Sequence, residues 1–177
     1  MVKILDLGCG KNKLKNAYGV DFVKFPGVDL AWNLNKSLPK KFNNKFDIVY
    51  HKCVLDHIGN PLDFLKNCKN YLKKNGKLIM VVDNGDYWRF HFHLGTYHAD
   101  IWESDEPRHP ETHHKMLFQM KHLIKMLKLI GLKIVNTDYY NDYDNLSLLK
   151  RLRRGYIDYL LPKHLGKNMI KIEALKT

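Results

Sequence analysis

The chain has 177 residues, a formal net charge of +12 at pH 7 and 45% hydrophobic residues. This length suits one globular domain, and no apolar run reaches the ~20 residues of a membrane-spanning helix. Three scattered cysteines without CxxC spacing argue against a disulfide framework. Because the first residues form a strand pattern and not a signal peptide, we expect a cytoplasmic protein. The positive charge leaves two interpretations open, a solvated lysine-rich surface or a polyanionic partner.

Hydrophobic patterning predicts alternating strands and helices along the chain. The expected strands cover residues 2–7, 18–22, 27–30, 45–51, 77–82, 132–137 and 169–175. The expected helices cover residues 60–75, 115–130 and 146–161, and Asn60-Pro61 is a typical start for the first of them. This alternation favours an α/β protein with a doubly wound, mainly parallel sheet, in a single domain that covers residues 1–177.

The first strand runs directly into the turn Gly8-Cys9-Gly10, and Asp21 closes the second predicted strand. In parallel sheets, glycines after the first strand let backbone N–H groups approach a ligand, and a carboxylate after the second accepts from ribose hydroxyls. A nicotinamide or flavin site would need glycine at position 13, where Lys13 stands. The pattern therefore favours another nucleotide-type ligand, with a purely structural glycine turn as the alternative.

Several motifs resemble one enzyme family. Asp6-Leu7-Gly8-Cys9-Gly10 resembles the first motif of class I S-adenosylmethionine-dependent methyltransferases. Phe46-Asp47-Ile48-Val49 and Val54–Ile58 are similar to the family's fourth region, and Tyr71–Leu78 is similar to its turn into strand five. The resemblance covers about residues 2–140 and the strand at 168–175. It implies a Rossmann-like fold with a seven-stranded, mostly parallel sheet and an antiparallel last strand.

The resemblance also implies the cofactor S-adenosyl-L-methionine. Its expected contacts are Asp6, Gly8, Cys9, Gly10, Asp21, Phe22, Asn33, Leu34 and His51. Asp21 corresponds to the residue that binds the ribose hydroxyls, and Asn33-Leu34 fall where the family contacts adenine. The chain departs from the family pattern in its missing third glycine and its short first crossover.

Methyl transfer from a sulfonium mainly requires alignment and exclusion of water, and a base is needed only when the acceptor arrives protonated. The acceptor site is expected beyond the carboxyl ends of strands four and five. Candidate catalytic residues in this region are His51, Asp56, His57, Tyr87 and His114.

Two substrate-side insertions are expected, at about residues 83–113 and 141–167. The first is rich in aromatic and acidic residues, which could form a small core or line an acceptor pocket. Its histidines match no zinc-binding spacing, so we expect no metal site. An acidic, aromatic mouth favours a small or peptide-borne acceptor over RNA.

A basic cluster within the second insertion contains Lys150, Arg151, Arg153 and Arg154. It could be the solvated face of a helix, or it could contact RNA or another anionic surface. The sequence thus supports a methyltransferase with an unidentified acceptor. A non-catalytic module with the same fold, which binds RNA or a partner protein, is the alternative.

Overall fold

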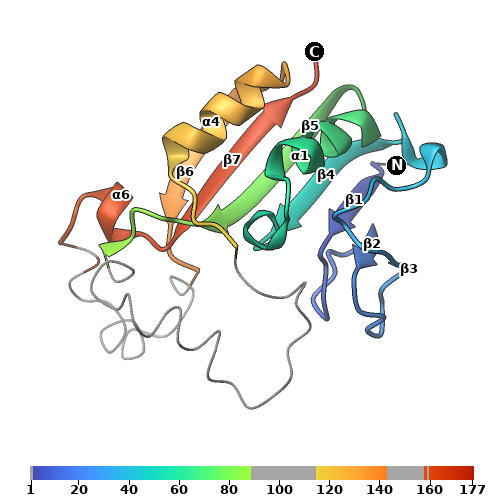
Figure 1. The fold of residues 1–177 in the computed structure, drawn as a ribbon, viewed down its shortest axis with the longest axis horizontal. Helices are drawn as coiled ribbons and strands as arrows, with labels where there is room; N and C mark the ends of the chain where they lie inside the picture. Colours follow the sequence, from blue (N-terminus) through green and yellow to red (C-terminus); the bar gives the residue numbers. More distant parts are fainter. Residues whose placement is uncertain (1, 89–114, 143–157, 159) are drawn as a thin grey trace.

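The computed structural model describes residues 2–88, 115–142, 158 and 160–177 (Figure 1). Large parts of both predicted insertions, and nearly all of the helix expected at 146–161, lie outside these residues. His114 and the basic cluster at 150–154 lie outside them as well. No helix in the described part of the chain is both long and apolar enough to cross a bilayer.

A seven-stranded sheet with the order β3-β2-β1-β4-β5-β7-β6 forms the centre of the molecule. The strands are β1 (Ile4–Leu7), β2 (Ala17–Asp21), β3 (Leu30–Ala31), β4 (Phe46–Lys52), β5 (Leu72–Asp83), β6 (Lys133–Tyr140) and β7 (Met169–Leu175). β1 pairs in parallel with β2 and β4, and only β7 runs antiparallel to its neighbours. The predicted fold class is confirmed. From β1 the chain adds β2 and β3 on one side of the sheet, and it then crosses to add β4 and β5 on the other side. The topological switch point therefore lies between β1 and β4.

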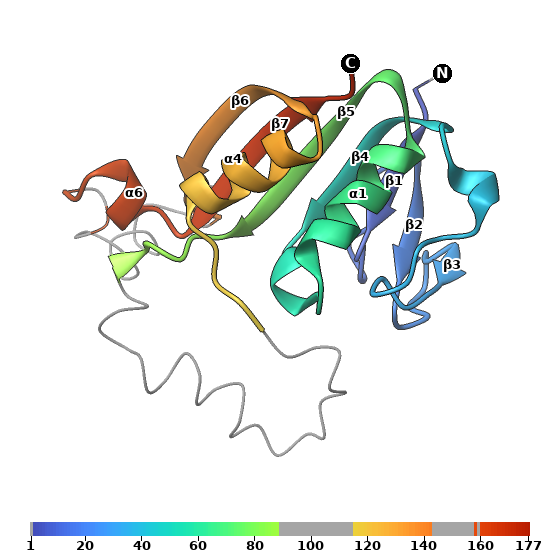
Figure 2. The same cartoon turned by 45° about the horizontal axis from the view of Figure 1, so that its top comes forward.

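Two longer helices, α1 (Pro61–Tyr71) and α4 (Met120–Leu129), pack on the same face of the sheet (Figure 2). Short helical turns are η1 (Lys40–Phe42), η2 (Leu55–His57) and α6 (Lys163–Gly166). α1 begins where the sequence predicts, because Asn60 caps it and proline occupies its first position. It ends earlier than predicted, since Leu72 already pairs with Phe46 as the first residue of β5.

α4 begins at Met120 and not at residue 115 as expected. The segment before it is extended, because Phe118 forms a β-bridge with Asn84. The Phe118 carbonyl also accepts from the Gly85 N–H at 2.8 Å. The apolar spacing from Met116 onward fits a helix equally well, so periodicity alone could not locate this boundary. α6 was not predicted, and the buried Asn84 amide holds it by donating to the carbonyls of His164 and Lys167.

The core lies between the sheet and this helix layer. α1 contributes Phe64, Leu65 and Cys68, and α4 contributes the fully buried Leu123 and Leu127. On the opposite face, the segment after β1 covers part of the sheet, where the Leu14 N–H donates to the Asp6 carboxylate at 2.8 Å. The described helices therefore shield one face, while the chain between β1 and β2 passes over the other.

Candidate cofactor and acceptor site

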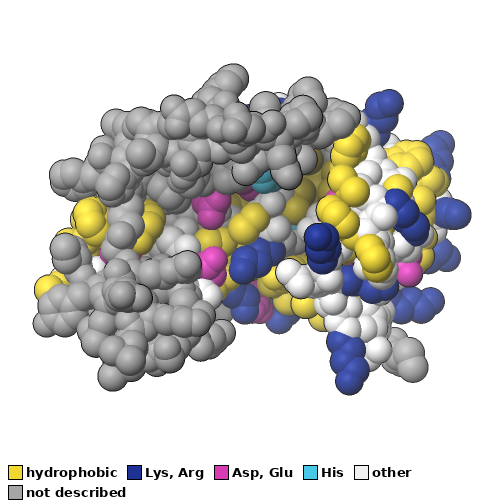
Figure 3. Space-filling view, turned by 90° about the horizontal axis from the view of Figure 1, so that it is seen from below, with side chains coloured by type: hydrophobic (Ala, Val, Ile, Leu, Met, Phe, Trp, Pro, Cys, Tyr) yellow, Lys and Arg dark blue, Asp and Glu magenta, His cyan; other side chains and the backbone are white. Residues whose placement is uncertain are grey.

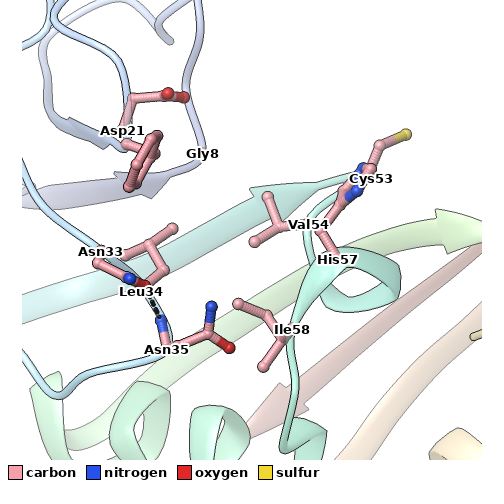
Figure 4. Close-up of a pocket in the computed structure, with 10 residues that line it drawn as sticks. Gly8, Asp21, Asn33, Leu34, Asn35, Cys53, Val54, His57 and Ile58 are labelled. Carbon is pink, nitrogen blue, oxygen red and sulfur yellow. Dashed lines mark hydrogen bonds between the residues drawn. The ribbon is translucent and has the colours of Figure 1, made fainter. Parts of the chain in front are cut away.

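A cavity of about 270 Å³ lies at the switch point, beside the carboxyl ends of β1, β2 and β4 (Figure 4). Its lining residues are Gly8, Asp21, Phe22, Asn33, Leu34, Asn35, Cys53, Val54, His57 and Ile58. One wall comes from the glycine turn and the end of β2, and the opposite wall comes from the chain that follows β4. This position is the ligand-binding location expected for an open α/β sheet.

The glycine turn is sterically restricted at Gly8. Its φ is +68°, and a Cβ atom there would lie 2.2 Å from Cγ2 of Val54. The Gly8 N–H donates to the Val20 carbonyl at 2.7 Å, which joins the turn to β2. Gly10 also has a positive φ, of +51°, but a Cβ atom there would meet open space. The turn therefore keeps bare backbone next to the cavity, as a bound nucleotide-like ligand requires.

Asp21 is held in place at the end of β2 by two backbone donors. Its Oδ2 accepts from the Gly10 N–H at 2.8 Å, and its Oδ1 accepts from the Val23 N–H at 3.0 Å. Each carboxylate oxygen has a second lone-pair site, so the group can still accept from two neighbouring hydroxyls. The glycine turn and the carboxylate thus form one unit that suits a ribose.

The remainder of the cavity wall is mainly apolar. Leu34 faces Val54 and Ile58 across the cavity (Figure 4). Asn35 holds the two walls of the cavity together. Its Oδ1 accepts from the Gly59 N–H at 2.8 Å, which ties the loop after β3 to the loop before α1. A flat heterocycle with a polar edge fits between apolar side chains and the backbone of such a loop. The residues present therefore fit the adenosine portion of S-adenosylmethionine.

Four of the predicted cofactor contacts do not line this cavity. Asp6 is buried and accepts from the Leu14 N–H, and burial raises the pKa of its carboxyl group. Cys9 is buried as well, and burial raises the pKa of its thiol to about 11. Gly10 acts through its N–H bond to Asp21. These three residues shape the turn, and the fourth, His51, lies in the core.

His51 is fully buried at the carboxyl end of β4, with its ring edge-on to Phe64 of α1 at 5.2 Å between centroids. Neither ring nitrogen has a hydrogen-bond partner among the described residues. Burial lowers the pKa of this imidazole to about 3, so it is neutral at physiological pH. His51 does not line the cavity, because the strand's alternation turns its side chain under α1. Its contact with substrate or cofactor stays a prediction.

His57 and Asp56 form the pair closest to a catalytic arrangement. His57 lines the cavity with a side chain that is 22% exposed, and its Nε2 lies 3.2 Å from Oδ2 of the buried Asp56. A carboxylate this close to one ring nitrogen favours one orientation of the histidine side chain. The other ring nitrogen, Nδ1, is buried in this structure.

Tyr87 is buried, and its hydroxyl donates to Oδ2 of Asp158 at 2.8 Å. The Trp88 indole N–H donates to the other oxygen of the same carboxylate. Tyr87 therefore joins the end of β5 to the segment before α6, and it does not line the cavity. No three His, Cys, Asp or Glu side chains are placed to share a metal ion within the described ranges.

The mouth beside the cavity is acidic. Burial raises the pKa of the Cys53 thiol to about 12, and the carboxylates of Asp83, Asp56 and Asp142 add to this rise. Burial also raises the pKa of the Tyr140 hydroxyl to about 12, and neighbouring groups that include Asp83 and Asp142 add to this rise. In the view from below, carboxylate side chains appear near the centre with lysine or arginine side chains beside them (Figure 3).

Sequence reasoning missed Asn35, Cys53, Val54 and Ile58 as lining residues. Val54 and Ile58 belong to the motif that was recognised after β4, so a signal for them was present in the sequence. Cys53 faces the cavity because its backbone has a φ of +51°, a conformation that no local pattern announces.

Solved structures share this architecture. A S-adenosylmethionine-dependent methyltransferase from Archaeoglobus fulgidus matches with a TM-score of 0.67 at 15% identity, over 99% of this chain and 86% of that one. At such low identity the similarity shows the fold alone, which is the methyltransferase fold.

The sequence itself matches the model of a methyltransferase domain family over residues 2–137. The chain belongs to this methyltransferase domain family, which confirms the class predicted from the glycine turn and the motif after β4.

The curated relatives are longer proteins, and each matches only a segment of this chain. A tRNA U34 carboxymethyltransferase from Pseudoalteromonas atlantica is 45% identical over 53 residues, which is 29% of this chain and 16% of that protein. A ubiquinone biosynthesis O-methyltransferase from Coxiella burnetii is 26% identical over 104 residues, 48% of this chain and 44% of that protein. The chain thus spans less than half the length of either relative.

Proposed function

We propose that this protein transfers a methyl group from S-adenosylmethionine to an acceptor bound at the acidic mouth. One observation carries the proposal: the Gly8–Gly10 turn and the Asp21 carboxylate are joined by a hydrogen bond at the edge of a cavity at the switch point. The family membership supports the same activity.

In this proposal each part of the cavity has a separate role. Asp21 accepts from the ribose hydroxyls, Leu34 and Ile58 enclose the adenine, and the backbone of the glycine turn supports the remainder. When bound, the cofactor would supply an activated methyl group on a sulfonium. Transfer of this methyl group leaves a neutral thioether. The protein then contributes mainly by fixing the acceptor in line and excluding water.

We assign His57 as the general base for acceptors that arrive protonated, with Asp56 orienting its ring. Support comes from the 3.2 Å separation of Nε2 and Oδ2, and from the position of His57 in the cavity wall. His57→Gln should lower the methyl-transfer rate by about 10²-fold with a protonated amine or phenol, and leave product binding unchanged. Equal rates for His57→Gln and the wild type would remove His57 from the mechanism.

The acceptor we propose is small or borne on a peptide, with a cationic or aromatic part. Burial raises the pKa of the Cys53 thiol, and Asp83 and Asp142 add to this rise, so carboxylates lie on the Cys53 side of the cavity. Such a mouth repels phosphate groups and attracts cations. A polyphosphate laid across this mouth would face repulsion.

Calorimetry with S-adenosylhomocysteine, the demethylated product, tests cofactor binding directly. We expect a micromolar dissociation constant, roughly −8 kcal/mol, for the wild type. Asp21→Asn should weaken binding by about 1.5–3 kcal/mol, because a charge-assisted acceptor is lost from the ribose site. Asp63→Asn removes an exposed carboxylate from α1 and should bind like the wild type. Equal affinities for Asp21→Asn and Asp63→Asn would contradict the assignment.

A further inference from the structure

The outward face of the helix layer carries a row of lysines. Lys121, Lys125 and Lys128 are exposed on α4. Their spacing of four and then three residues places them on one side of the helix, over a length of about 10 Å. The apolar side of the same helix, with Leu123 and Leu127, is fully buried against the sheet. The row therefore points away from the core along the whole of α4.

Among the described residues, no ion pair neutralises this row. α4 contains no acidic residue, and none of its three lysines forms an ion pair within the part of the chain that the structure describes. Several lysines on other elements are paired, as in Lys77–Glu173 at 3.0 Å and Lys171–Glu173 at 2.9 Å. A surface selected only for solubility tends to intersperse both signs, and the α4 row does not.

A groove of about 380 Å³ lies at the C-terminal end of α4, between this end and α1, and Lys66, Lys69, Asn70, Leu129 and Ile130 line it. Lys69 is fixed in the groove, because its Nζ donates to the Ile130 carbonyl at 2.7 Å. An ammonium has three N–H donors, so two remain for another acceptor. The groove thus contains a positioned cation next to an exposed row of three lysines.

We infer that this lysine surface, formed by the α4 row and the α1–α4 groove, binds the phosphodiester backbone of a nucleic acid strand. A row of uncompensated positive charges beside a groove matches the repeating negative charges of such a backbone. The surface is made by the outer sides of the helices, whereas the acidic mouth lies at the carboxyl ends of the strands. Nucleic acid bound here leaves the cofactor cavity open.

An anionic membrane is a poorer match for this surface. Binding in the plane of a bilayer requires an apolar helix face that can enter the headgroup region. The apolar face of α4 is occupied by the sheet, and the main exposed apolar side chain on the helix is Leu129, at 72% exposure. Positive charge without an apolar face favours a hydrated phosphate backbone.

The test compares two triple variants that change the net charge equally. The first replaces Lys121, Lys125 and Lys128 with Gln. The control replaces Lys77, Lys163 and Lys171, which are ion-paired on other elements, with Gln. Binding of fluorescein-labelled poly(U) and poly(dT) is measured by anisotropy at several salt concentrations, and thermal unfolding checks that each variant is folded.

We expect the α4 variant to bind poly(U) about tenfold or more weakly, with the slope of log affinity against log salt reduced by about two units. The control should keep nearly the wild-type slope, and a preference between poly(U) and poly(dT) identifies the natural strand. Equal losses in both triple variants would show that total charge alone matters and would overturn the inference. Binding to phosphatidylserine vesicles with none to either oligonucleotide would overturn it in favour of a membrane.

Discussion

At the scale of single residues, the two glycines of the cofactor turn differ in what a side chain would meet. Both have positive φ, but a Cβ atom at Gly8 would collide with Val54, whereas one at Gly10 would meet open space. Gly10→Ala should lower the free energy of unfolding by about 1 kcal/mol, the cost of the left-handed backbone. Gly8→Ala should lower it by about 2–4 kcal/mol, because overpacking is added.

Urea unfolding measures both glycine variants, and a second substitution separates the two causes. Val54→Ala in the Gly8→Ala background removes the atom in collision, so it should restore part of the lost stability. The backbone contribution should remain. Equal losses for Gly8→Ala and Gly10→Ala would mean that Val54 moves aside without cost.

His51 predicts an acid-sensitive fold. Burial lowers the pKa of its imidazole from 6.5 to about 3, so between these values the unfolded chain binds a proton that the folded chain excludes. The free energy of unfolding should therefore fall as the pH drops below 6.5, by up to about 1.4 kcal/mol per pH unit. Asp6 acts in the opposite direction, because burial raises the pKa of its carboxyl group.

His51→Leu isolates this contribution, since leucine fills the same core position beside Phe64 without titrating. The variant should be more stable than the wild type at pH 5, and the difference between them should shrink toward pH 7. Chemical unfolding at pH 5, 6 and 7 measures the difference. If the free energy of unfolding changes equally with pH in the two proteins, His51 is protonated or has a hydrogen-bond partner in the folded state.

At the scale of elements, the start of α1 depends on Asn60. Its Oδ1 accepts from the Asp63 N–H at 3.2 Å, and its Nδ2 donates to the Asp63 carboxylate at 2.7 Å. Asn60→Ala leaves a helix N–H without an acceptor, so it should destabilise the fold by about 1 kcal/mol. Asn60→Ser keeps a capping oxygen and should lose much less in thermal unfolding. Equal melting temperatures for the two variants would exclude the cap as a source of stability.

The strands and α1 were predictable because their signals are local. Apolar runs mark β1, β4 and β7, and an asparagine followed by a proline marks the start of α1. The start of α4 was not predictable, because the pairing of Asn84 with Phe118 competes with a helical pattern. The early start of β5 has the same origin, in the pairing of Leu72 with Phe46.

The candidate site was predictable to a similar extent. Gly8, Asp21, Phe22, Asn33 and Leu34 line the cavity as expected, because the ends of parallel strands meet at one edge of the sheet. His51 lies outside the cavity wall, because a motif gives a position along the chain and not the face of the strand. Tyr87 was misjudged since its partner, Asp158, lies 71 positions further along the chain.

At the scale of the whole molecule, the net charge of +12 predicts a dependence of stability on salt. Like charges repel one another in the compact state, and salt reduces the range of this repulsion to about 10 Å at 0.1 M. The melting temperature should therefore rise between low salt and moderate sodium chloride. The variant with Gln at the three α4 lysines should have a higher melting temperature at low salt and a smaller rise with added salt. Sucrose at equal osmolality controls for solvent exclusion.

The position of β7 has a consequence for how the protein folds during its synthesis. β7 lies between β5 and β6, and its residues Ile170, Ile172 and Ala174 are fully buried. β5 and β6 leave the ribosome before it, yet β6 has no neighbour, and β5 is paired only with β4, until residues 169–175 emerge. Because translation adds about 5–20 residues per second, these strands and the apolar side of α4 stay exposed for seconds. The nascent chain is thus most prone to aggregation, and most in need of a chaperone, in the interval before β7 appears.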